Sequence, residues 1–598
     1  MNDATVSPAV APPPAAAAPP PPPKPQRPVF CDAISHAYSG RGKGVVVLTG
    51  NTHDIYFNAK VGERGKYLEL ERSIYQEWKA NFHVLRLDIA GGLECFVDEE
   101  LETLQRAVTI FDSSVQKGEK IGTDLKAQFA ATRGNPLVAL VLLQQLVNAI
   151  NRVRESKPSA GFKPILAVVK FAGSLLPAGD WEKLGELDRQ RLVTFLNLID
   201  SPSFTASPHL VVLVADTRSE VNRRILAVPS SACVEIDLPL DGERRDYINF
   251  NLQTGGVKPT FERNEEQFVA DTCGLKLTNL QDIMEASRRL GEHITSKQVN
   301  EIINDALESL LGGVVKVKRP NHTFADVVGY AETVGILRDV MKRCEDPTKA
   351  VSGVLIVGPN GTGKTFLMEA AAAESERVVI ELVGLRGSYF GDTDSFFERF
   401  AMVVRTFGKI GIFIDEAATA FGSVHRTDTH ETEKRLAGNI IKLMGDPTMK
   451  SKVVWFLMTS RPDELDPDVK SRCPIQIPVF DLAGEDREKF LAQLFRRKKI
   501  AVPEGEEMVQ VLQLIQDYSN RDLDFLVAEV NASNGLSVVQ TLKRWRASCS
   551  IKVERDLQKL IAAQHCSYPG LLPEELRDEV YKPEFAKRVQ VLKQMLYN

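Results

Sequence analysis

The sequence has few of the features that mark secreted, membrane-spanning or zinc-binding proteins. Its eight cysteines are scattered over 598 residues, without a CxxC pair or histidines at zinc spacing. Reduced thiols, many of them in cores, are therefore expected. No uninterrupted apolar run reaches the roughly 18 residues that span a bilayer, and the amino terminus lacks a basic stretch followed by an apolar one. These absences favour a soluble cytoplasmic protein with no membrane partner.

A strong net charge is missing as well. The formal net charge is −5 and the sequence pI is about 6.1, so the overall electrostatics do not indicate a nucleic acid partner. A local basic cluster at Arg496–Lys499 could contact phosphate, but four bases at the end of a helix more often form a solvated face. What the chain has is an ordinary globular composition, 43% hydrophobic and 26% charged. Its length exceeds one domain of about 100–200 residues, so several separate cores are expected.

Composition and periodicity divide the chain into six parts. Residues 1–28 are largely Pro, Ala and Val and predict a disordered tail, which serves either as a spacer or as a docking motif. Alternating apolar strands and helical stretches over 29–310 predict a mostly parallel α/β sheet closed by helices, and 323–482 repeats that order of elements. The remaining parts are a Gly-led basic linker at 311–322, a helical lid at 483–541 and a charged helical extension at 542–598.

The two α/β series also share a local pattern. In each, a buried strand leads through a turn containing Thr and Arg to a short strand with a proline and then to a helix start rich in acids and bases, at 210–248 and at 453–491. Ancient duplication and convergence are the two explanations. A helix is expected at 66–80. The expected strands are the apolar runs 44–48, 84–87, 165–169, 210–214, 353–357, 378–382, 411–414 and 453–458.

The clearest motif is GxxxxGK[ST], which follows an apolar strand and precedes a helical run. Glycines let such a loop wrap with its backbone N–H groups inward, where they and the helix dipole bind phosphate. Lys364 should reach the β- and γ-phosphates of ATP, and the Thr365 hydroxyl should coordinate Mg²⁺. The predicted cradle consists of Gly358, Pro359, Asn360, Gly361, Thr362, Gly363, Lys364 and Thr365.

A second motif is the buried strand at 411–414, which ends in two carboxylates. Ligands of open α/β sheets collect at the carboxyl ends of the strands, so Asp415 is expected near the metal. Glu416 is expected to orient and deprotonate the attacking water. An Asp-Glu pair after a strand can also be a helix N-cap. The P-loop upstream favours the catalytic interpretation.

In this order the motifs resemble those of the AAA family of ATPases, over about residues 323–534. The resemblance implies a P-loop NTPase fold with a helical lid, ATP and Mg²⁺ as cofactors, and a homo-oligomer that is usually a hexameric ring. It also implies that the segment with Asp326, Val328 and Gly329 lies against adenine. Ser460 takes the sensor 1 position, where the family usually has asparagine and where a hydroxyl has a shorter reach.

The same resemblance gives roles to two arginines. Arg472 lies where the family places an arginine finger that enters the neighbouring subunit's site, although the second arginine often found there is missing. Arg521 matches a sensor 2 arginine of the wider superfamily, and a surface salt bridge is the alternative. Family members proper more often have alanine there, and they usually have an acid where this chain has Ala418.

By the same resemblance, residues 29–310 look like a first AAA-type module that has lost its chemistry. The turn Gly50–Asp54 sits where a P-loop would be, yet it lacks the glycine spacing and the lysine. His53 and Asp54 within it have no third partner for acid–base work and favour turn chemistry. The third core strand ends in Lys170 and Phe171 instead of carboxylates, so a metal ligand and a water base are both missing.

The segment Ser388–Asp394 resembles the family's pore loop, with Tyr389, Phe390 and Gly391 at its centre. An exposed aromatic pair can grip an unfolded polypeptide without reading its sequence, whereas the alternative is that both rings pack under the loop. Together with a trans arginine, this loop favours a ring-forming ATP-driven motor that remodels or unfolds a protein client. A nucleotide-switched scaffold is the competing hypothesis, and a DNA-associated motor or loader is the third.

Overall fold

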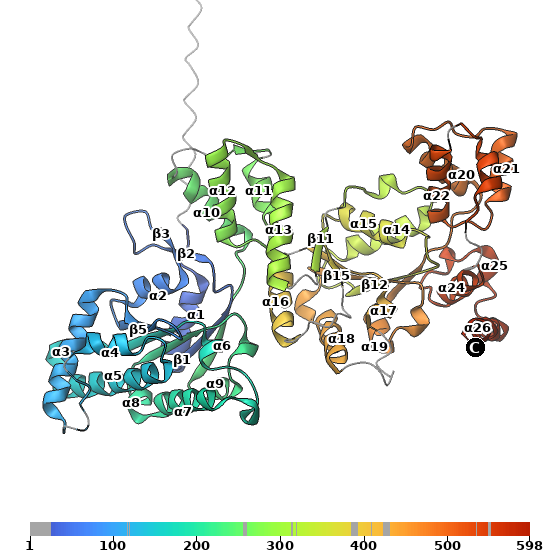
Figure 1. Ribbon diagram of the computed structural model, residues 1–598. Helices are drawn as coiled ribbons and strands as arrows, with labels where there is room; N and C mark the ends of the chain where they lie inside the picture. Colours follow the sequence, from blue (N-terminus) through green and yellow to red (C-terminus); the bar gives the residue numbers. More distant parts are fainter. Residues whose placement is uncertain are drawn as a thin grey trace, which may run out of the picture.

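The computed structural model describes residues 25–597 apart from 117, 119, 123, 255–259, 263, 312–314, 319, 384–392, 408, 422–430, 534 and 548–551. It contains two α/β modules, each followed by a helical lid, and a C-terminal helical extension (Figure 1). The amino-terminal tail as far as residue 24 and the predicted pore loop at Tyr389, Phe390 and Gly391 lie outside the described residues.

The first module is built on a six-stranded sheet in the order β5-β4-β6-β7-β1-β8. Its strands are parallel except the edge strand β5, which pairs antiparallel with β4. The central strands are continuous apolar runs that are fully buried, because helices cover both faces of the sheet. The strands are β1 (Val45–Gly50), β4 (His83–Asp88), β5 (Gly92–Cys95), β6 (Ile165–Val169), β7 (Leu210–Val214) and β8 (Ser231–Ile236). The helices are α1 (Val29–Ser35), α2 (Leu70–Trp78), α3 (Asp98–Ser114), α4 (Leu125–Ala131), α5 (Pro136–Ser156), α6 (Ala172–Leu175), α7 (Glu186–Asp200), α8 (Pro202–Thr205) and α9 (Arg223–Leu226).

The second module repeats the order of the five parallel strands in a sheet β11-β13-β14-β15-β12-β16, whose edge strand β11 precedes the core strands in the chain instead of following one of them. Again five strands are parallel and one edge strand, β11, is antiparallel to its neighbour. The strands are β11 (Val315–Lys318), β12 (Gly353–Val357), β13 (Val378–Leu382), β14 (Ile410–Ile414), β15 (Val453–Thr459) and β16 (Ile475–Pro478). The helices are α14 (Ala331–Arg343), α15 (Lys364–Glu374), α16 (Thr393–Thr406), α17 (Ala417–Phe421), α18 (Glu431–Met444) and α19 (Pro467–Ser471).

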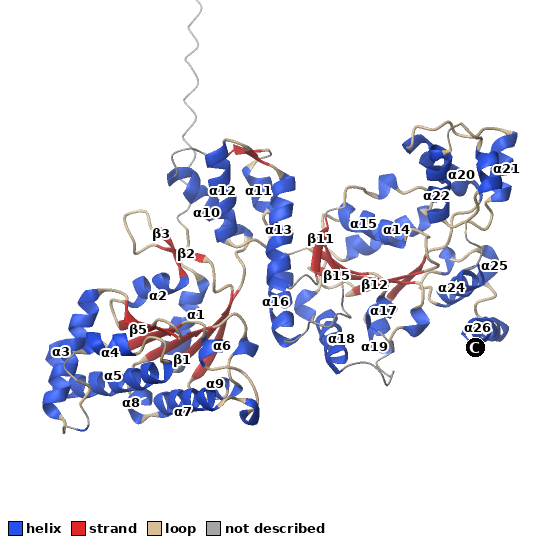
Figure 2. Cartoon of the chain, viewed as in Figure 1, coloured by secondary structure: helices blue, strands red, loops and turns tan. Residues whose placement is uncertain are grey.

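Each sheet is followed along the chain by its own group of lid helices, so the predicted doubled fold is confirmed (Figure 2). The first lid consists of α10 (Asp241–Thr254), α11 (Glu265–Asp271), α12 (Leu277–Leu290) and α13 (Ser296–Leu311). The second lid consists of α20 (Gly484–Arg497), α21 (Glu506–Leu514), α22 (Asn520–Ala532) and α23 (Val538–Arg544). The C-terminal extension follows with α24 (Lys552–Gln564), α25 (Glu574–Arg577) and α26 (Pro583–Tyr597).

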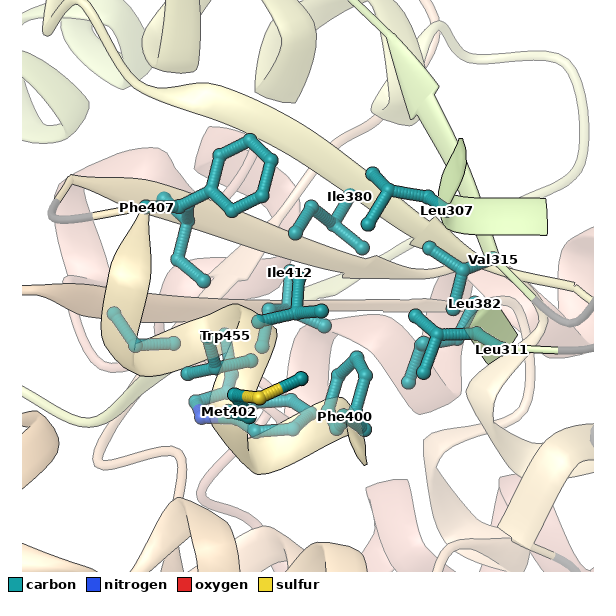
Figure 3. Close-up of a cluster of buried hydrophobic side chains, with 14 of the residues drawn as sticks. Leu307, Leu311, Val315, Ile380, Leu382, Phe400, Met402, Phe407, Ile412 and Trp455 are labelled. Atoms are coloured by element: carbon teal, nitrogen blue, oxygen red, sulfur yellow. The ribbon is translucent and has the colours of Figure 1, made fainter. Parts of the chain in front are cut away.

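The first lid is packed against the second module, and these two parts share one hydrophobic core. Leu307 and Leu311 of α13 lie beside Phe400 of α16, and the same cluster continues to Ile412 and Trp455 of the second sheet (Figure 3). All five side chains are almost fully buried. Burial on this scale is the main stabilising term in protein association, so the first lid and the second module are expected to move as one body.

Two segments differ from the expectation from sequence. The expected helix at 66–80 starts only at Leu70, because Lys66–Glu69 forms β3, which closes a hairpin with β2 (Ile55–Asn58). Tyr67 faces the rings of Tyr247 and Phe250 from the lid, and this packing favours a strand there. The stretch expected as a linker contributes β11 to the edge of the second sheet.

Helix α5 is long and apolar enough to cross a membrane by length and composition. It lies instead between α3 and α7, where Leu140, Leu143, Val147 and Ile150 are buried in the first module's core. Seven of the cysteines fall in the described part of the chain, and all seven are free thiols, as predicted. Burial raises the pKa of Cys31 and Cys473 to about 12, so both stay protonated at neutral pH.

Candidate functional site

The loop between β12 and α15 is held by hydrogen bonds to its carbonyl oxygens. The Lys364 ammonium donates to the carbonyls of Gly358 and Pro359 at 2.9 and 3.0 Å. The next carbonyl, that of Asn360, accepts a hydrogen bond from the Arg555 guanidinium of α24. Three successive carbonyls therefore face protein donors.

The next two carbonyls of the loop, those of Gly361 and Thr362, accept hydrogen bonds from the second lid and from Tyr330, which precedes α14. The carbonyl of Gly361 accepts from the N–H of Arg521 at 3.1 Å. The carbonyl of Thr362 accepts from the Tyr330 hydroxyl at 2.9 Å and from the Asn520 amide at 3.2 Å. Five successive carbonyls are thus engaged by protein donors, which leaves the N–H groups of the loop as its groups for binding phosphate.

Three side chains with the chemistry of a metal and phosphate site lie beside this loop. The Thr365 hydroxyl is 3.3 Å from a carboxylate oxygen of Asp415, at the carboxyl end of β14. A hydroxyl and a carboxylate are hard oxygen donors of the kind that Mg²⁺ prefers. Glu416 follows with a φ of 48°, a conformation that is strained for a non-glycine residue.

The electrostatics of the site are coupled. Burial lowers the pKa of Lys364 to about 8, and the nearby charges of Glu416 and Asp415 oppose that shift. Burial raises the pKa of Glu416, while the Lys364 charge opposes that shift. A raised carboxyl pKa suits a group that must accept a proton. The residues present therefore fit a nucleotide with its Mg²⁺, which when bound screens the phosphates and polarises them toward attack.

A cavity of about 410 Å³ runs from this loop to the second lid. It brings together residues that the sequence placed in separate motifs, because the lid folds back over the carboxyl edge of the sheet. Gly329, predicted beside it, has a φ of 71°, and a Cβ there would come within 2.5 Å of Leu482. Of the predicted residues, Asp326, Val328, Asn360, Gly361, Thr362, Gly363, Lys364, Thr365, Asp415, Glu416 and Arg521 line the cavity.

Within the described part of the chain, the predicted residues that do not line the cavity are Gly329, Gly358, Pro359, Ser460 and Arg472. Ser460 is buried directly after β15, with 3% of its surface exposed. Arg472 is exposed at the end of α19, and its guanidinium packs against Gly445. An exposed arginine away from the chain's own cavity is what a finger acting on a neighbouring subunit requires.

Several residues of this site were not predicted from the sequence. Tyr330 and Asn520 bind the loop; both lie within the segments that resemble the family's entry and lid motifs, but neither was assigned a role. Arg497, expected on a solvated face, lines the cavity. Its spacing of four from Gln493 and seven from Phe490, both of which also line the cavity, is a helical period that could have indicated one face of α20.

The first module has a corresponding site with different residues. Gly50 is the last residue of β1 and Gly358 directly follows β12, and a Cβ on either would lie within 2.3 Å of a carbonyl oxygen, that of Ile236 in β8 or of Val479 just after β16. The following helix starts with Leu70 and Glu71 in α2, where α15 starts with Lys364 and Thr365.

The end of the third core strand corresponds as well. After β6 the chain has Lys170 and then Phe171, where β14 is followed by Asp415 and Glu416. Phe171 has a φ of 51°, close to the 48° of Glu416, so the strained turn is present although the carboxylate is not. The backbone conformation at this position is thus the same in both modules, although the first module lacks the carboxylate.

The charges of the first site are inverted and paired with each other. Glu71 binds Lys170 at 2.7 Å, in the place where the second module has the Thr365 hydroxyl and the Asp415 carboxylate. His53 binds Asp216 at 2.8 Å, and this hydrogen bond lowers the pKa of Asp216. The cavity here is larger, about 790 Å³, but a carboxylate stands where the second module has a hydroxyl, and an ammonium stands where it has a carboxylate. Because this carboxylate and ammonium neutralise each other, neither is free to bind Mg²⁺ or phosphate.

Fold and site together define a P-loop nucleoside triphosphatase whose second module carries the nucleotide site and whose first module has the same architecture without the chemistry. Comparison with known families agrees with this class. Residues 14–237 match the AAA+ chaperone N-terminal Rossmann-like domain, and residues 354–480 match the AAA model, ATPase family associated with various cellular activities. The chain therefore belongs to the AAA ATPases, which use ATP with Mg²⁺.

Individual relatives support the same family. The chain is 26% identical to the cell division cycle protein 48 homolog of Archaeoglobus fulgidus, over 38% of this chain and 32% of the relative. It is 28% identical to the proteasome-activating nucleotidase of Pyrococcus horikoshii, over 39% and 61%, respectively. It is 26% identical to katanin p60 ATPase-containing subunit A1 of Strongylocentrotus purpuratus, over 37% and 45%. The chain thus spans less than two thirds of each of these relatives.

Proposed function

We propose that the second module binds Mg·ATP and hydrolyses it, with roles divided among the residues of its cavity. Lys364 binds the β- and γ-phosphates, Thr365 and Asp415 hold Mg²⁺, and Glu416 takes a proton from the attacking water. The observation that carries this proposal is the single cavity in which the P-loop, the acidic strand end and the lid meet.

The remaining predicted residues have supporting roles in the proposal. The segment with Asp326, Val328 and Gly329 contacts the base, and Arg521 contacts the phosphates from the lid. Ser460, at the strand end beside the acidic pair, positions the attacking water.

We further propose that the chain works as a homo-oligomeric ring, hexameric as in much of its family, that remodels or unfolds a protein client in the cytoplasm. The exposure of Arg472 supports the ring, because an arginine finger must reach a neighbour's γ-phosphate. The names of the relatives support a protein client, since one is a proteasome-activating nucleotidase. In this proposal Tyr389, Phe390 and Gly391 grip the client.

A nucleotide-switched scaffold remains the second candidate, and one observation favours it. The helix α16 is bound by the inert first site: Ser395 lies 3.0 Å from Thr217, Glu398 accepts from the backbone of Arg218, and Arg399 binds Glu220 at 3.2 Å. A first module fixed to α16 in this way could transmit the nucleotide state to a partner without any threading.

The test uses a folded reporter protein with an unstructured tag, the full chain and ATP. A remodelling motor unfolds the reporter, and Tyr389→Ala stops unfolding while leaving basal ATPase activity within a few-fold. Glu416→Gln, which should bind ATP without turning it over, traps the tagged reporter. ATPase activity with no unfolding and no trapping would reject the motor and support the scaffold.

A further inference from the structure

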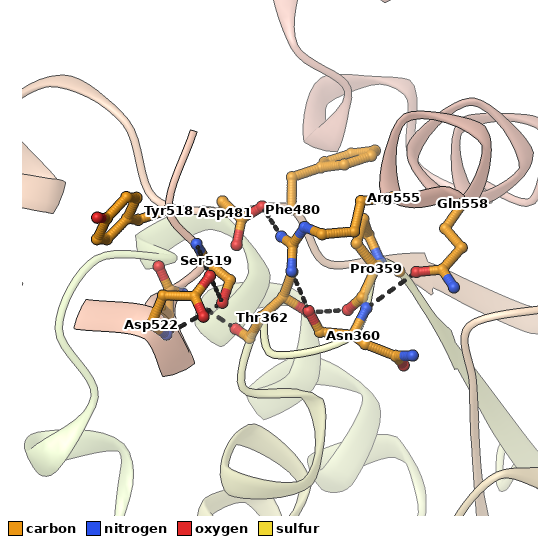
Figure 4. A network of polar contacts seen from close by, with 12 residues as sticks. Pro359, Asn360, Thr362, Phe480, Asp481, Tyr518, Ser519, Asp522, Arg555 and Gln558 are labelled. Carbon is orange, nitrogen blue, oxygen red and sulfur yellow. Dashed lines mark hydrogen bonds and ion pairs between the residues drawn. The ribbon is translucent and has the colours of Figure 1, made fainter. Parts of the chain in front are cut away.

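The C-terminal extension reaches the nucleotide loop directly. Helix α24 places Arg555 and Gln558 against Asn360, the residue that precedes the phosphate-binding part of the loop (Figure 4). The carbonyl of Asn360 accepts from the Arg555 guanidinium, and its N–H donates to the Gln558 side-chain oxygen at 3.1 Å. Both main-chain groups of one loop residue are therefore bound by one helix.

These contacts are partly shielded from water. Gln558 has 3% of its surface exposed, and the Arg555 side chain has 13% exposed. The second arm of the Arg555 guanidinium forms an ion pair with Asp481, in the loop after β16. The planar fork thus joins Asn360 to Asp481, and charged hydrogen bonds of this kind are stronger than neutral ones.

The helix that carries these groups is fixed independently of the nucleotide loop. Leu557, Leu560 and Ile561 of α24 pack with Phe585 and Val589 of α26 in a small core, against which Phe480 of the loop after β16 is also packed. This packing fixes the position of α24, and with it the positions of Glu554, Arg555 and Gln558, which face the second module.

The same helix also contacts the turn that follows Ser460. Glu554 binds Arg461 at 2.8 Å, one helical turn before Gln558. One side of α24 therefore bridges the nucleotide loop, the Ser460 turn and the loop after β16. These are three segments that must keep their relative positions for a nucleotide to be held and hydrolysed.

We infer that Arg555 and Gln558 are positioning residues for nucleotide binding, which makes the C-terminal extension part of the ATP site. They hold Asn360 so that the N–H groups of residues 361–365 converge before the nucleotide arrives. The inference rests on the proposed function, since it concerns the same loop. We call the contacts of Arg555 and Gln558 with Asn360 the clamp. Without the clamp, part of the binding energy of the nucleotide must be used to order the loop, so the affinity for ATP falls while the reacting groups stay intact.

The test measures the affinity of the full chain for a fluorescent ATP analogue, together with KM and kcat for ATP. Arg555→Ala should weaken affinity and raise KM about tenfold or more, with kcat within about threefold. Gln558→Met, which keeps the length of the side chain and removes the acceptor, should do the same to a smaller extent. Asp556→Ala is the matched control, because Asp556 is exposed on the same helix.

The outcomes separate this inference from the proposed function. If the parent protein binds the analogue and both Arg555→Ala and Gln558→Met bind it with the same affinity, the clamp is overturned and the proposed function is not. A fall in kcat with KM unchanged also overturns the clamp, because that pattern belongs to a group acting only in the transition state. Failure of the unchanged protein to bind the analogue overturns both. If Arg555→Ala does not fold, Gln558→Met decides.

Discussion

The two modules share a backbone and differ in charge. The five parallel strands have the same order in both sheets, and only the antiparallel edge strand differs, since β5 follows β4 whereas β11 precedes β12. A glycine that tolerates no Cβ stands at the end of β1 and directly after β12, and a strained residue follows the third core strand in both modules, Phe171 and Glu416. The second site combines an ammonium, a hydroxyl and two carboxylates, whereas the first combines Leu70 with a closed Glu71–Lys170 ion pair. The comparison teaches that the fold does not require the polar groups of the nucleotide site. The side chains that differ lie at the carboxyl ends of the strands, whereas the fold depends on the apolar side chains within the sheet.

The two lids are also attached differently. In the second module Asn520 and the N–H of Arg521, at the start of α22, bind the nucleotide loop. In the first module the start of α12 binds a carboxylate of the protein itself: Asp54 accepts from the N–H groups of Leu277 and Thr278 at 3.0 and 2.9 Å. An internal anion at a helix N-terminus thus fastens the first lid permanently.

The largest expected effect tests whether the second site is completed by a neighbour. Arg472→Ala should lower turnover by as much as about 10³–10⁵-fold, with nucleotide affinity within a few-fold, because a finger stabilises charge only in the transition state. Lys470→Ala, a basic neighbour on α19, is the control. ATPase activity per subunit should also rise with protein concentration.

A mixing experiment sharpens this test. Glu416→Gln subunits keep Arg472, and Arg472→Ala subunits keep Glu416, so mixed rings should regain part of the activity. If light scattering shows mixed rings but the activity is only the sum of the two parents, Arg472 does not act in trans.

The next effect concerns the lysine that the first module replaces by Leu70. Lys364→Ala should abolish tight ATP binding, since it removes the charge that meets the phosphates, while Glu416→Gln should bind ATP and lose turnover. Asp415→Asn should weaken the dependence on Mg²⁺. Equal affinity of Lys364→Ala and the unchanged protein would refute the site. Residual turnover in Lys364→Ala that a change at His53 or Asp54 removed would show that the first module is active after all.

A smaller effect tests the internal anion of the first module. Asp54 is 3% exposed, and Asp54→Ala would leave buried N–H groups of α12 without their acceptor. Each such group costs about 1–3 kcal/mol, so the free energy of unfolding should fall accordingly. Urea denaturation measures this fall, and Asp54→Asn, which keeps one acceptor oxygen, should lose less. Equal stability of Asp54→Ala and the unchanged chain would mean that the first lid is held only by its apolar packing.

The smallest effect is a pH dependence that only the second site should show. The pKa of Lys364 is lowered to about 8, so the ammonium is charged below pH 8 and neutral above it. ATP affinity should therefore be full below pH 8 and should weaken above it, by at most about tenfold per pH unit. Binding at pH 8.5 should take up a proton, which calorimetry in two buffers of different ionisation enthalpy measures. Lys364→Arg should flatten this limb, and an unchanged slope in that variant would assign the titration to another group.

Toward low pH a second pH dependence is expected, in turnover instead of in ATP affinity. Burial raises the pKa of Glu416, so its proton-accepting form is lost at a higher pH than for an ordinary glutamate. Turnover should decline toward low pH while ATP binding persists, and kcat followed against pH would show this.

The sequence by itself determined the class of the protein. The motif from Gly358 to Thr365 and the strand that ends in Asp415 and Glu416 are local patterns, in which neighbouring residues are brought together by one turn and one strand end. The repeated alternation of strands and helices was sufficient for the doubled fold, because buried parallel strands are continuous apolar runs wherever they lie.

Only the tertiary structure decided what surrounds these motifs. The hairpin of β2 and β3 is set by packing on the first lid, and the fusion of that lid to the second sheet depends on contacts between Leu307, Leu311 and Phe400. Arg555 lies 195 positions from Asn360 in the chain and carries no motif. Its place beside the nucleotide loop follows from the contacts of α24 with Asp481, Arg461 and Phe480 of the second module. Local patterns constrain the residues next to them, whereas long-range contacts depend on the sum of many weak packing terms that no short segment encodes.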